Sequence, residues 1–164
     1  MRSKVDEEPR FAADCMLGTL AKWLRVLGYD TFYRNRVEDA DLVSLARSEG
    51  RILLTRDRRL TLRRQAPPFL LIESQRAAEQ LRQVAAAFEL RLDGARVLTR
   101  CLRCNETTLE TAQEEAAPRI PPYVLQTQER FRRCPSCERI YWGATHRDAM
   151  LARIRQMVGP DQTR

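Results

Sequence analysis

The sequence predicts an α/β fold: a parallel sheet flanked by helices, then a small module built around four cysteines, and a C-terminal helix. Three observations predict it. From residue 10 to about residue 90, short apolar runs alternate with helical patterns, as in parallel βα units. Two CxxC pairs follow. A chain of 164 residues can bury a core of about 100 residues and a second module small enough to need a metal.

The expected strands of the first part are short apolar runs bounded by turns or charged residues. They are residues 11–14, 29–33, 51–55 and 69–73. Helical spacing of apolar residues lies between and after them. The expected helices are residues 17–27, which end at Gly28; a segment from Asp39 or Asp41 to Gly50; and residues 76–88.

In the second part, residues 89–100 predict a strand or a linker. Three prolines between the CxxC pairs exclude a continuous helix, so turns and one short helix are expected there. Residues 139–144 predict a strand, and a helix is expected from Thr145 or His146 to about Met157. The predicted domains are a disordered start (1–9), an α/β domain (10–95), the cysteine module with the last helix (96–158) and a disordered tail (159–164).

Composition narrows the class of protein. No apolar run approaches the roughly 20 residues that span a bilayer, and the polar start MRSKVDEEPR lacks a signal peptide, so we expect a cytoplasmic protein without membrane contact. Net charge is +7, and of the 29 basic residues only Lys4 and Lys22 are lysines. The planar guanidinium of arginine matches phosphate, which favours a nucleic-acid partner. The alternative is a GC-rich coding bias toward arginine.

The four paired cysteines are Cys101, Cys104, Cys134 and Cys137, and 29 residues separate the pairs. Two CxxC turns can bring four thiolates around one Zn²⁺, and four sulfurs leave no open position for water. A structural zinc ribbon is therefore predicted, with unmetallated or redox thiols as the alternative. Cys15 stands apart and is expected to be a buried small apolar residue. Around the pairs lies a group of arginines, Arg100, Arg103, Arg130, Arg132, Arg133 and Arg139, which fit a phosphate backbone or a solvated surface.

Aspartates follow the predicted strands. Asp14 comes after the first strand and Asp57 after the third, and these strands are neighbours in the common 2-1-3 order. Asp39 and Asp41 begin the helix after the second strand, which opens on the same edge. Clustered carboxylates repel one another unless a cation neutralises them, so the pattern predicts a Mg²⁺ or Mn²⁺ site suited to phosphodiester hydrolysis. Singly, each acid could instead be a helix cap or an arginine partner.

Other chemistries find less support. His146 is the only histidine, which excludes a two-histidine ribonuclease mechanism within one chain. The phosphate loop GxxxxGK[ST] is absent.

Several segments together resemble the Mut-seven-C RNase domain family of PIN-like nucleases with a zinc ribbon. They are residues 13–30, 38–42, 51–60, 101–109 and 120–146. The resemblance spans roughly residues 10 to 155 and implies a PIN-like fold, RNA as substrate and carboxylate-bound Mg²⁺ or Mn²⁺. By position, Asp14, Asp39 with Asp41 two residues on, and Asp57 match the acids of the family. No fourth acid is evident, because Arg58 and Arg59 follow Asp57.

The sequence thus predicts a metal-dependent ribonuclease. The expected RNA contacts are Lys22, Arg56, Arg58, Arg59 and Arg133. The alternative is a non-catalytic RNA- or ribosome-associated protein on the same fold, and a protein partner or antidote stays open.

Overall fold

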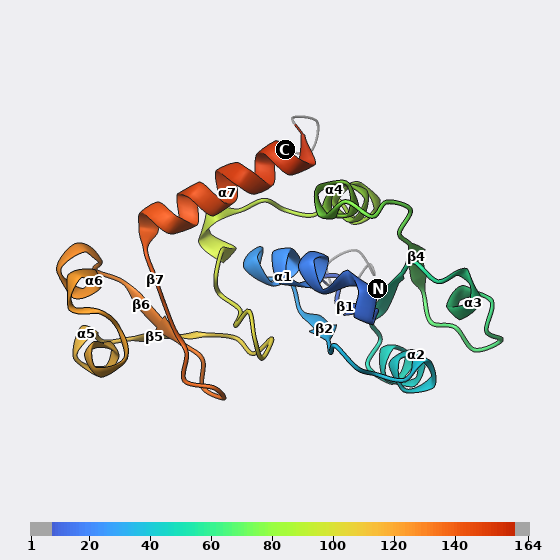
Figure 1. Cartoon of the computed structure of the whole chain (residues 1–164), viewed down its shortest axis with the longest axis horizontal. Helices are drawn as coiled ribbons and strands as arrows, with labels where there is room; N and C mark the ends of the chain where they lie inside the picture. The colour runs from blue at the N-terminus through green and yellow to red at the C-terminus, as the bar shows by residue number, and fades with distance from the viewer. Residues whose placement is uncertain (1–7, 160–164) are drawn as a thin grey trace, which may run out of the picture.

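The computed structural model describes residues 8–159, so most of the two termini predicted to be disordered lies outside the described residues. A parallel sheet with its helices forms one end of the molecule, and a smaller antiparallel sheet forms the other (Figure 1). Of the predicted disordered segments, Glu8 is described, and its carboxylate pairs with the Arg96 guanidinium.

The parallel sheet contains β1 (Phe11–Ala13), β2 (Thr31–Tyr33), β3 (Ile52–Thr55) and β4 (Phe69–Leu71). Its strand order is β2-β1-β3-β4, and every pair is parallel, which confirms the predicted fold class and the neighbouring positions of β1 and β3. Each strand is one or two residues shorter than its apolar run, because the chain turns away where the ladder of hydrogen bonds ends.

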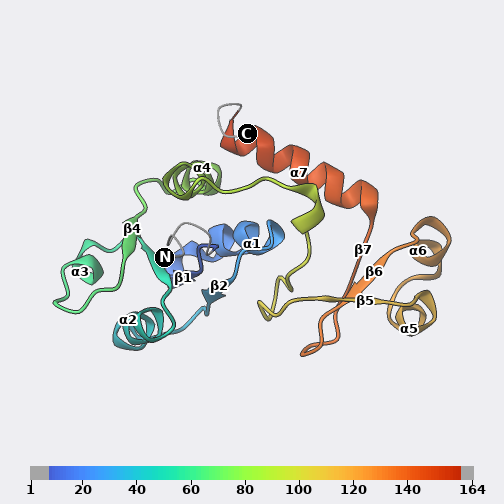
Figure 2. The ribbon, with the colours of Figure 1, turned by 180° about the vertical axis from the view of Figure 1, so that it is seen from behind.

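Helices cover both faces of this sheet. On one face lie α1 (Gly18–Val26) and α4 (Ala77–Phe88), and on the other α2 (Asp39–Ser48) (Figures 1 and 2). The short α3 (Arg58–Thr61) contributes Leu60 to the core on the side of α2. The sequence does not predict α3, because four residues are too few to show helical periodicity. The 3-10 turns η1 (Cys15–Leu17) and η2 (Gly94–Arg96) lead into and out of this layer.

Alternate residues of the strands pack into two apolar clusters, one on each face of the sheet. Phe11 and Ala13 pack with α1 and α4, whereas Ala12 and Leu53 pack with α2. Burial on both faces explains why the strands read as continuous apolar runs and not as alternating patterns.

The long C-terminal helix α7 (Ala144–Val158) belongs to the core of the parallel sheet. Leu151, Ile154 and Val158 are buried in the same cluster as α1 and α4, and Figure 1 shows α7 reaching from the small sheet to α4. The predicted domain boundary between residues 95 and 96 stays a prediction. Helix α7, which was predicted as part of the cysteine module, packs on the α/β domain.

The small sheet contains β5 (Leu109–Thr111), β6 (Phe131–Arg133) and β7 (Ile140–Trp142), antiparallel in that order. The segment between the CxxC pairs holds more structure than the turns and single helix expected of it: β5, α5 (Gln113–Ala116), η3 (Ala117–Arg119), α6 (Pro122–Thr127) and β6. Each piece is too short for a local pattern, and its stability comes from a shared apolar cluster. That cluster is Ala116, Ile120, Val124, Phe131 and Ile140.

Residues 89–100 form a linker, one of the two predicted alternatives, and the linker packs tightly on the end of α1. Gly28 has φ +85°, and a Cβ there would lie 2.8 Å from the Arg96 carbonyl oxygen. The predicted stop of α1 at glycine is therefore required both by the backbone conformation and by the close approach of the linker.

Replacing Ile154 by alanine tests the packing of α7. The side chain is fully buried, so its truncation should lower the free energy of unfolding by about 2 to 5 kcal/mol. Urea denaturation followed by circular dichroism measures the loss. Gln156→Ala, at an exposed position of the same helix, is the matched control and should unfold at nearly the wild-type midpoint. Equal midpoints for both variants would contradict a core role for α7.

Candidate functional site

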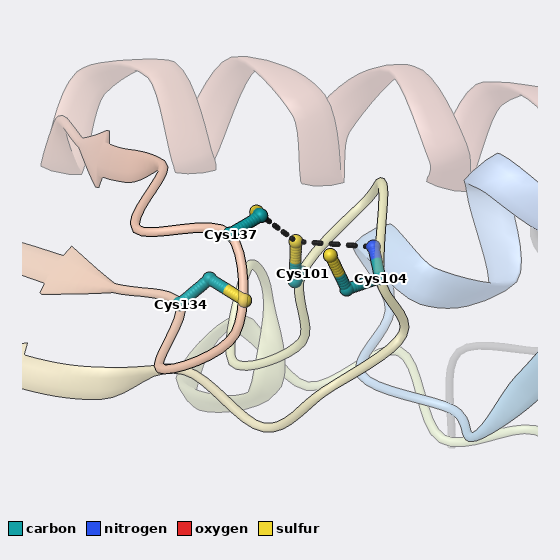
Figure 3. A group of neighbouring side chains, drawn as sticks. All are labelled: Cys101, Cys104, Cys134 and Cys137. Carbon is teal, nitrogen blue, oxygen red and sulfur yellow. Dashed lines mark hydrogen bonds between the residues drawn. The ribbon is translucent and has the colours of Figure 1, made fainter.

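Four cysteines from two loops point toward a common centre (Figure 3). The Sγ atoms of Cys101, Cys104, Cys134 and Cys137 all lie within 4.8 Å of one another. The first cysteine of each pair is buried and the second is half-buried. The predicted grouping of these side chains is confirmed, and four thiolates at this spacing could hold a tetrahedral Zn²⁺.

The two loops share one backbone pattern. The N–H of Asn105 donates to the Cys101 carbonyl oxygen at 3.0 Å, and the N–H of Glu138 donates to that of Cys134 at 2.9 Å. Asn105 and Glu138 both have positive φ, at 67° and 59°. The left-handed residue after each CxxC turns the chain back, so that both cysteines of a pair face the same side.

Hydrogen bonds prepare one thiol for ionisation. Burial alone would raise the pKa of Cys101, but the Tyr141 hydroxyl at 3.2 Å and backbone N–H donors outweigh it and lower the pKa to about 6. Burial and the neighbouring sulfurs of Cys137 and Cys101 raise the pKa of Cys104 to about 12. Without a cation the four thiols cannot all ionise, and a divalent metal would remove that conflict.

The first cysteine loop is bound to the parallel sheet through a buried arginine. The Arg25 guanidinium donates to the Thr31 carbonyl oxygen at 2.9 Å, and to those of Leu102 and Arg103 at 2.9 and 3.2 Å. The structural role of Arg25 was not predicted from the sequence. Arg25 lies four residues after the buried Ala21, on the apolar face of the expected helix, and this position could have indicated a buried arginine.

An asparagine completes this attachment. Asn105 accepts from the Thr31 N–H at 2.9 Å and donates to Asp30 Oδ1 at 2.7 Å. Asp30 also accepts from Arg51. Burial would raise the pKa of Asp30, but the hydrogen bonds from Arg51 and Asn105 lower it to about 2. The edge strand β2 is thus connected to the first cysteine loop through its own backbone N–H.

At the carboxyl edge of the parallel sheet, two of the predicted acids meet through a threonine. The Thr55 hydroxyl donates to Asp14 Oδ2 at 2.9 Å and accepts from the Asp57 N–H at 3.0 Å. Asp14 is only 6% exposed, and Thr55 is fully buried. Asp14 and Asp57 therefore lie on the same edge, as their positions after β1 and β3 predict.

The other two predicted acids sit at the start of α2. Asp39 and Asp41 occupy its first turn, and both are exposed. Arg63 lies 3.6 Å from Asp39 Oδ2. Among residues 8–143 and 147–159, whose side chains the structure describes, the cysteines are the one group of three or more ligand side chains gathered within 4.8 Å. The carboxylates share an edge without forming so tight a group.

Asp57 has a second structural role, as the cap of α3. It accepts from the Arg59 backbone N–H at 2.8 Å, and the Arg59 guanidinium lies 3.1 Å away. The hydrogen bonds from the Arg59 side chain and backbone lower the pKa of Asp57, so this acid stays ionised and available to a cation or an arginine.

The predicted RNA contacts are spread over the molecule. Arg58 and Arg59 are exposed at the acidic edge, and Arg56 is half-buried, with its Nε buried and unpaired within the described part of the chain. Lys22 is exposed on α1. Arg133, on β6, lies 3.6 Å from Glu138. Three of the five thus adjoin the edge where Asp14 and Asp57 meet.

The expectation that Cys15 is buried is wrong, because its side chain is exposed. It lies in η1, directly after Asp14, where the chain leaves the sheet edge toward solvent. Interaction with the neighbouring Asp14 carboxylate raises the pKa of this thiol.

The sequence of this chain matches one model of a known protein family. A family model described as Mut7-C RNAse domain matches residues 9–154. No curated protein matches the chain, and no solved structure does. Within residues 8–159, every helix is too short or too polar to cross a bilayer.

Replacing Thr55 by valine tests the link between Asp14 and Asp57. The change keeps the shape but leaves a buried carboxylate oxygen and a backbone N–H unpaired, which should lower the free energy of unfolding by about 1 to 3 kcal/mol. Thr55→Ser keeps the hydroxyl and loses one methyl, so its cost should stay near ~0.8 kcal/mol. Urea denaturation compares the two variants. A valine variant at least as stable as the serine variant would argue against the hydrogen-bonded link.

Proposed function

Because the chain belongs to the Mut7-C RNAse domain family, we propose that it is a ribonuclease that hydrolyses RNA phosphodiesters with a divalent cation held at the edge of the parallel sheet. The observation that carries the proposal is that Thr55 binds both the Asp14 carboxylate and the Asp57 backbone N–H, which places the two residues together on the edge where ligands of parallel sheets bind. Hard carboxylate oxygens are the ligands that Mg²⁺ and Mn²⁺ take in proteins.

Asp14 and Asp57 would hold the cation, with Asp39 or Asp41 as a further ligand. When bound, such a cation lowers the pKa of a water molecule and neutralises charge that develops on the phosphate. Thr55 holds one oxygen of Asp14, so that carboxylate keeps its orientation before substrate arrives. A carboxylate that is already ordered loses little entropy on binding a metal, which favours a preformed site.

The neighbouring arginines would bind the RNA backbone. Arg58 and Arg59 are exposed beside Asp57. The Arg58 guanidinium can donate two parallel hydrogen bonds to a phosphate, whereas that of Arg59 would first have to leave the Asp57 carboxylate. Arg56 is half-buried beside Asp57 and would approach the same phosphate. These residues would orient the scissile phosphate over the acids and stabilise its negative charge.

The cysteine cluster would hold one structural Zn²⁺. All four positions would be filled by sulfur, so the ion would stabilise the fold without activating water. Through Arg25 and Asn105 it would also hold the edge strand β2 in place. The arginines around the CxxC pairs, among them Arg133, would supply a second contact with RNA.

A second candidate function is RNA binding without cleavage, in a cytoplasmic protein that is RNA- or ribosome-associated. The observation that favours it is the pairing of two acids with arginines: Arg59 with Asp57, and Arg63 with Asp39. In such a protein these pairs would take the place of the cation. A protein partner or antidote would be compatible with either function.

The nuclease proposal predicts a loss of cleavage when both linked acids are neutralised. With Mn²⁺ and mixed RNA, Asp14→Asn combined with Asp57→Asn should reduce the cleavage rate by about 100-fold or more, since even residues behind the metal ligands are worth about 10- to 100-fold. Gel analysis of RNA fragments measures the rate. Equal cleavage by wild type and variant would remove the enzyme proposal, and calorimetric titration with Mn²⁺ would then show whether any cation site remains.

The zinc proposal predicts one equivalent of zinc per chain. Cys134→Ser should lose most of it and unfold at lower denaturant concentration, because binding of a structural zinc contributes directly to folding. Metal analysis by mass spectrometry measures the stoichiometry. Cys15→Ser is the matched control, since Cys15 is exposed and stands outside the cluster, and should keep its zinc. If purified wild-type protein contained no zinc and added zinc did not raise the denaturant concentration at which it unfolds, the proposal would be contradicted.

A further inference from the structure

An open groove of about 690 Å³ runs along α2, between that helix and the loop that follows α3. None of the sites described above accounts for it. Its lining residues come from one helix face and one loop: Ala40, Val43, Ser44, Arg47, Ser48, Arg63, Arg64 and Gln65.

The helix presents this face because its other face is committed to the core. Leu42 and Ala46 are buried against the sheet, together with Leu60 of α3. Ser44 and Arg47 are exposed on the groove side. The loop after α3 then returns past the exposed face of α2 and forms the second wall.

The lining is basic and carries no acid. Three arginines from the two walls, Arg47, Arg63 and Arg64, face a space lined otherwise by serine, glutamine and small apolar residues. Arg47 donates to Gln65 Oε1 at 2.5 Å, a neutral partner that leaves its charge in place. Arg64 is exposed and forms no ion pair with any residue whose side chain the structure describes. Arg63 is paired with Asp39, but the charges of Arg47 and Arg64 are left to attract anions to this concave surface.

The groove continues directly from the acidic edge. Asp39 begins α2, and its carboxylate pairs with Arg63, which also lines the groove. From there α2 runs back along the sheet for ten residues, or about 15 Å. A chain lying over Asp14 and Asp57 could therefore enter the groove beside Arg63 and follow α2 past Arg47.

We propose that this groove binds the phosphate backbone of a single RNA strand on its way to or from the acidic edge. The proposal rests on the proposed function for the identity of the ligand, and it adds the course of the strand, which none of the expected RNA contacts specifies. One helix and one loop with three arginines suit one backbone, since single strands are commonly held in basic grooves that follow their phosphates.

Binding measured without cleavage tests this course. The protein carries Asp14→Asn and Asp57→Asn so that RNA stays intact, and fluorescence anisotropy of a labelled single-stranded RNA gives the affinity at several salt concentrations. Adding Arg47→Gln and Arg64→Gln should reduce the log-log salt slope by about 1.4 and weaken binding about 25-fold near 0.1 M salt, since each single-strand phosphate contact contributes about 0.7 to the slope. Arg63 is left in place so that its pair with Asp39 is undisturbed.

The matched control removes the same charge elsewhere. Arg91 and Arg153 are exposed, and they lie on the layer of α4 and α7, across the sheet from α2. Replacing both by glutamine should change affinity by less than about threefold, because only general attraction is lost. Equal losses from the two pairs, or no loss from the groove pair, would overturn the proposal.

A second change tests the groove without removing an arginine. Ser44→Glu places an acid on the exposed wall of α2 and should weaken binding about fivefold, the value of one phosphate contact near 0.1 M salt. Ser44→Gln, of similar size and neutral, should bind as before. Equal affinity of the two would count against the groove.

These results separate the two proposals. A protein that cleaves no RNA yet loses binding selectively with the groove arginines would retain the groove and lose the nuclease. Cleavage that survives with binding indifferent to the groove would leave the nuclease and overturn the course proposed here. No measurable RNA binding by the protein would overturn both.

Discussion

The parallel pairing of β1 with β3 is the constraint on which the candidate site depends. Its register places Ala13 opposite Leu54, and the next N–H, that of Asp14, still bonds to the Leu54 carbonyl oxygen. Asp14 therefore leaves the sheet beside Thr55, whose hydroxyl binds the Asp14 carboxylate and the backbone N–H of Asp57. A shift of one residue would turn the Asp14 side chain to the other face of the sheet. The apolar strands and their helices supply the rigidity that maintains this register.

A second connection joins the two sheets into one structure. Arg25 is buried, and a buried charge is costly unless it is fully hydrogen-bonded. Its partners are backbone carbonyl oxygens from β2 and from the first cysteine loop, so the charge is satisfied only when both are in place. Asn105 and Asp30 add contacts between the same segments. With α7 returning to the first core, the cysteine loops become part of the framework around the α/β sheet.

The positions of the guanidinium groups divide the many arginines into two classes, those bound inside the fold and those exposed to solvent. Some are structural, such as Arg25 and Arg51, which bind backbone or carboxylate partners inside the fold. Others, such as Arg58 at the acidic edge and Arg64 in the groove along α2, are exposed to solvent. Structural arginines are satisfied by the protein itself, whereas those facing solvent keep their donors for a phosphate. The same residue type thus has a structural role inside the fold and a proposed role in binding phosphate at the surface, and net charge alone does not separate the two.

Local patterns sufficed to predict the parallel sheet, the turn at Gly28, the strand-end positions of Asp14 and Asp57, and the cysteine cluster. Apolar runs, helical spacing and CxxC pairs each involve residues that are close together in the sequence. The tertiary structure decided the rest. The hydroxyl of Thr55 between two acids, the attachment through Arg25, the three-stranded sheet of the ribbon and the exposure of Cys15 each depend on partners distant in sequence. Such contacts leave no periodic signal, because they arise only after the chain has folded and brought the separate segments together.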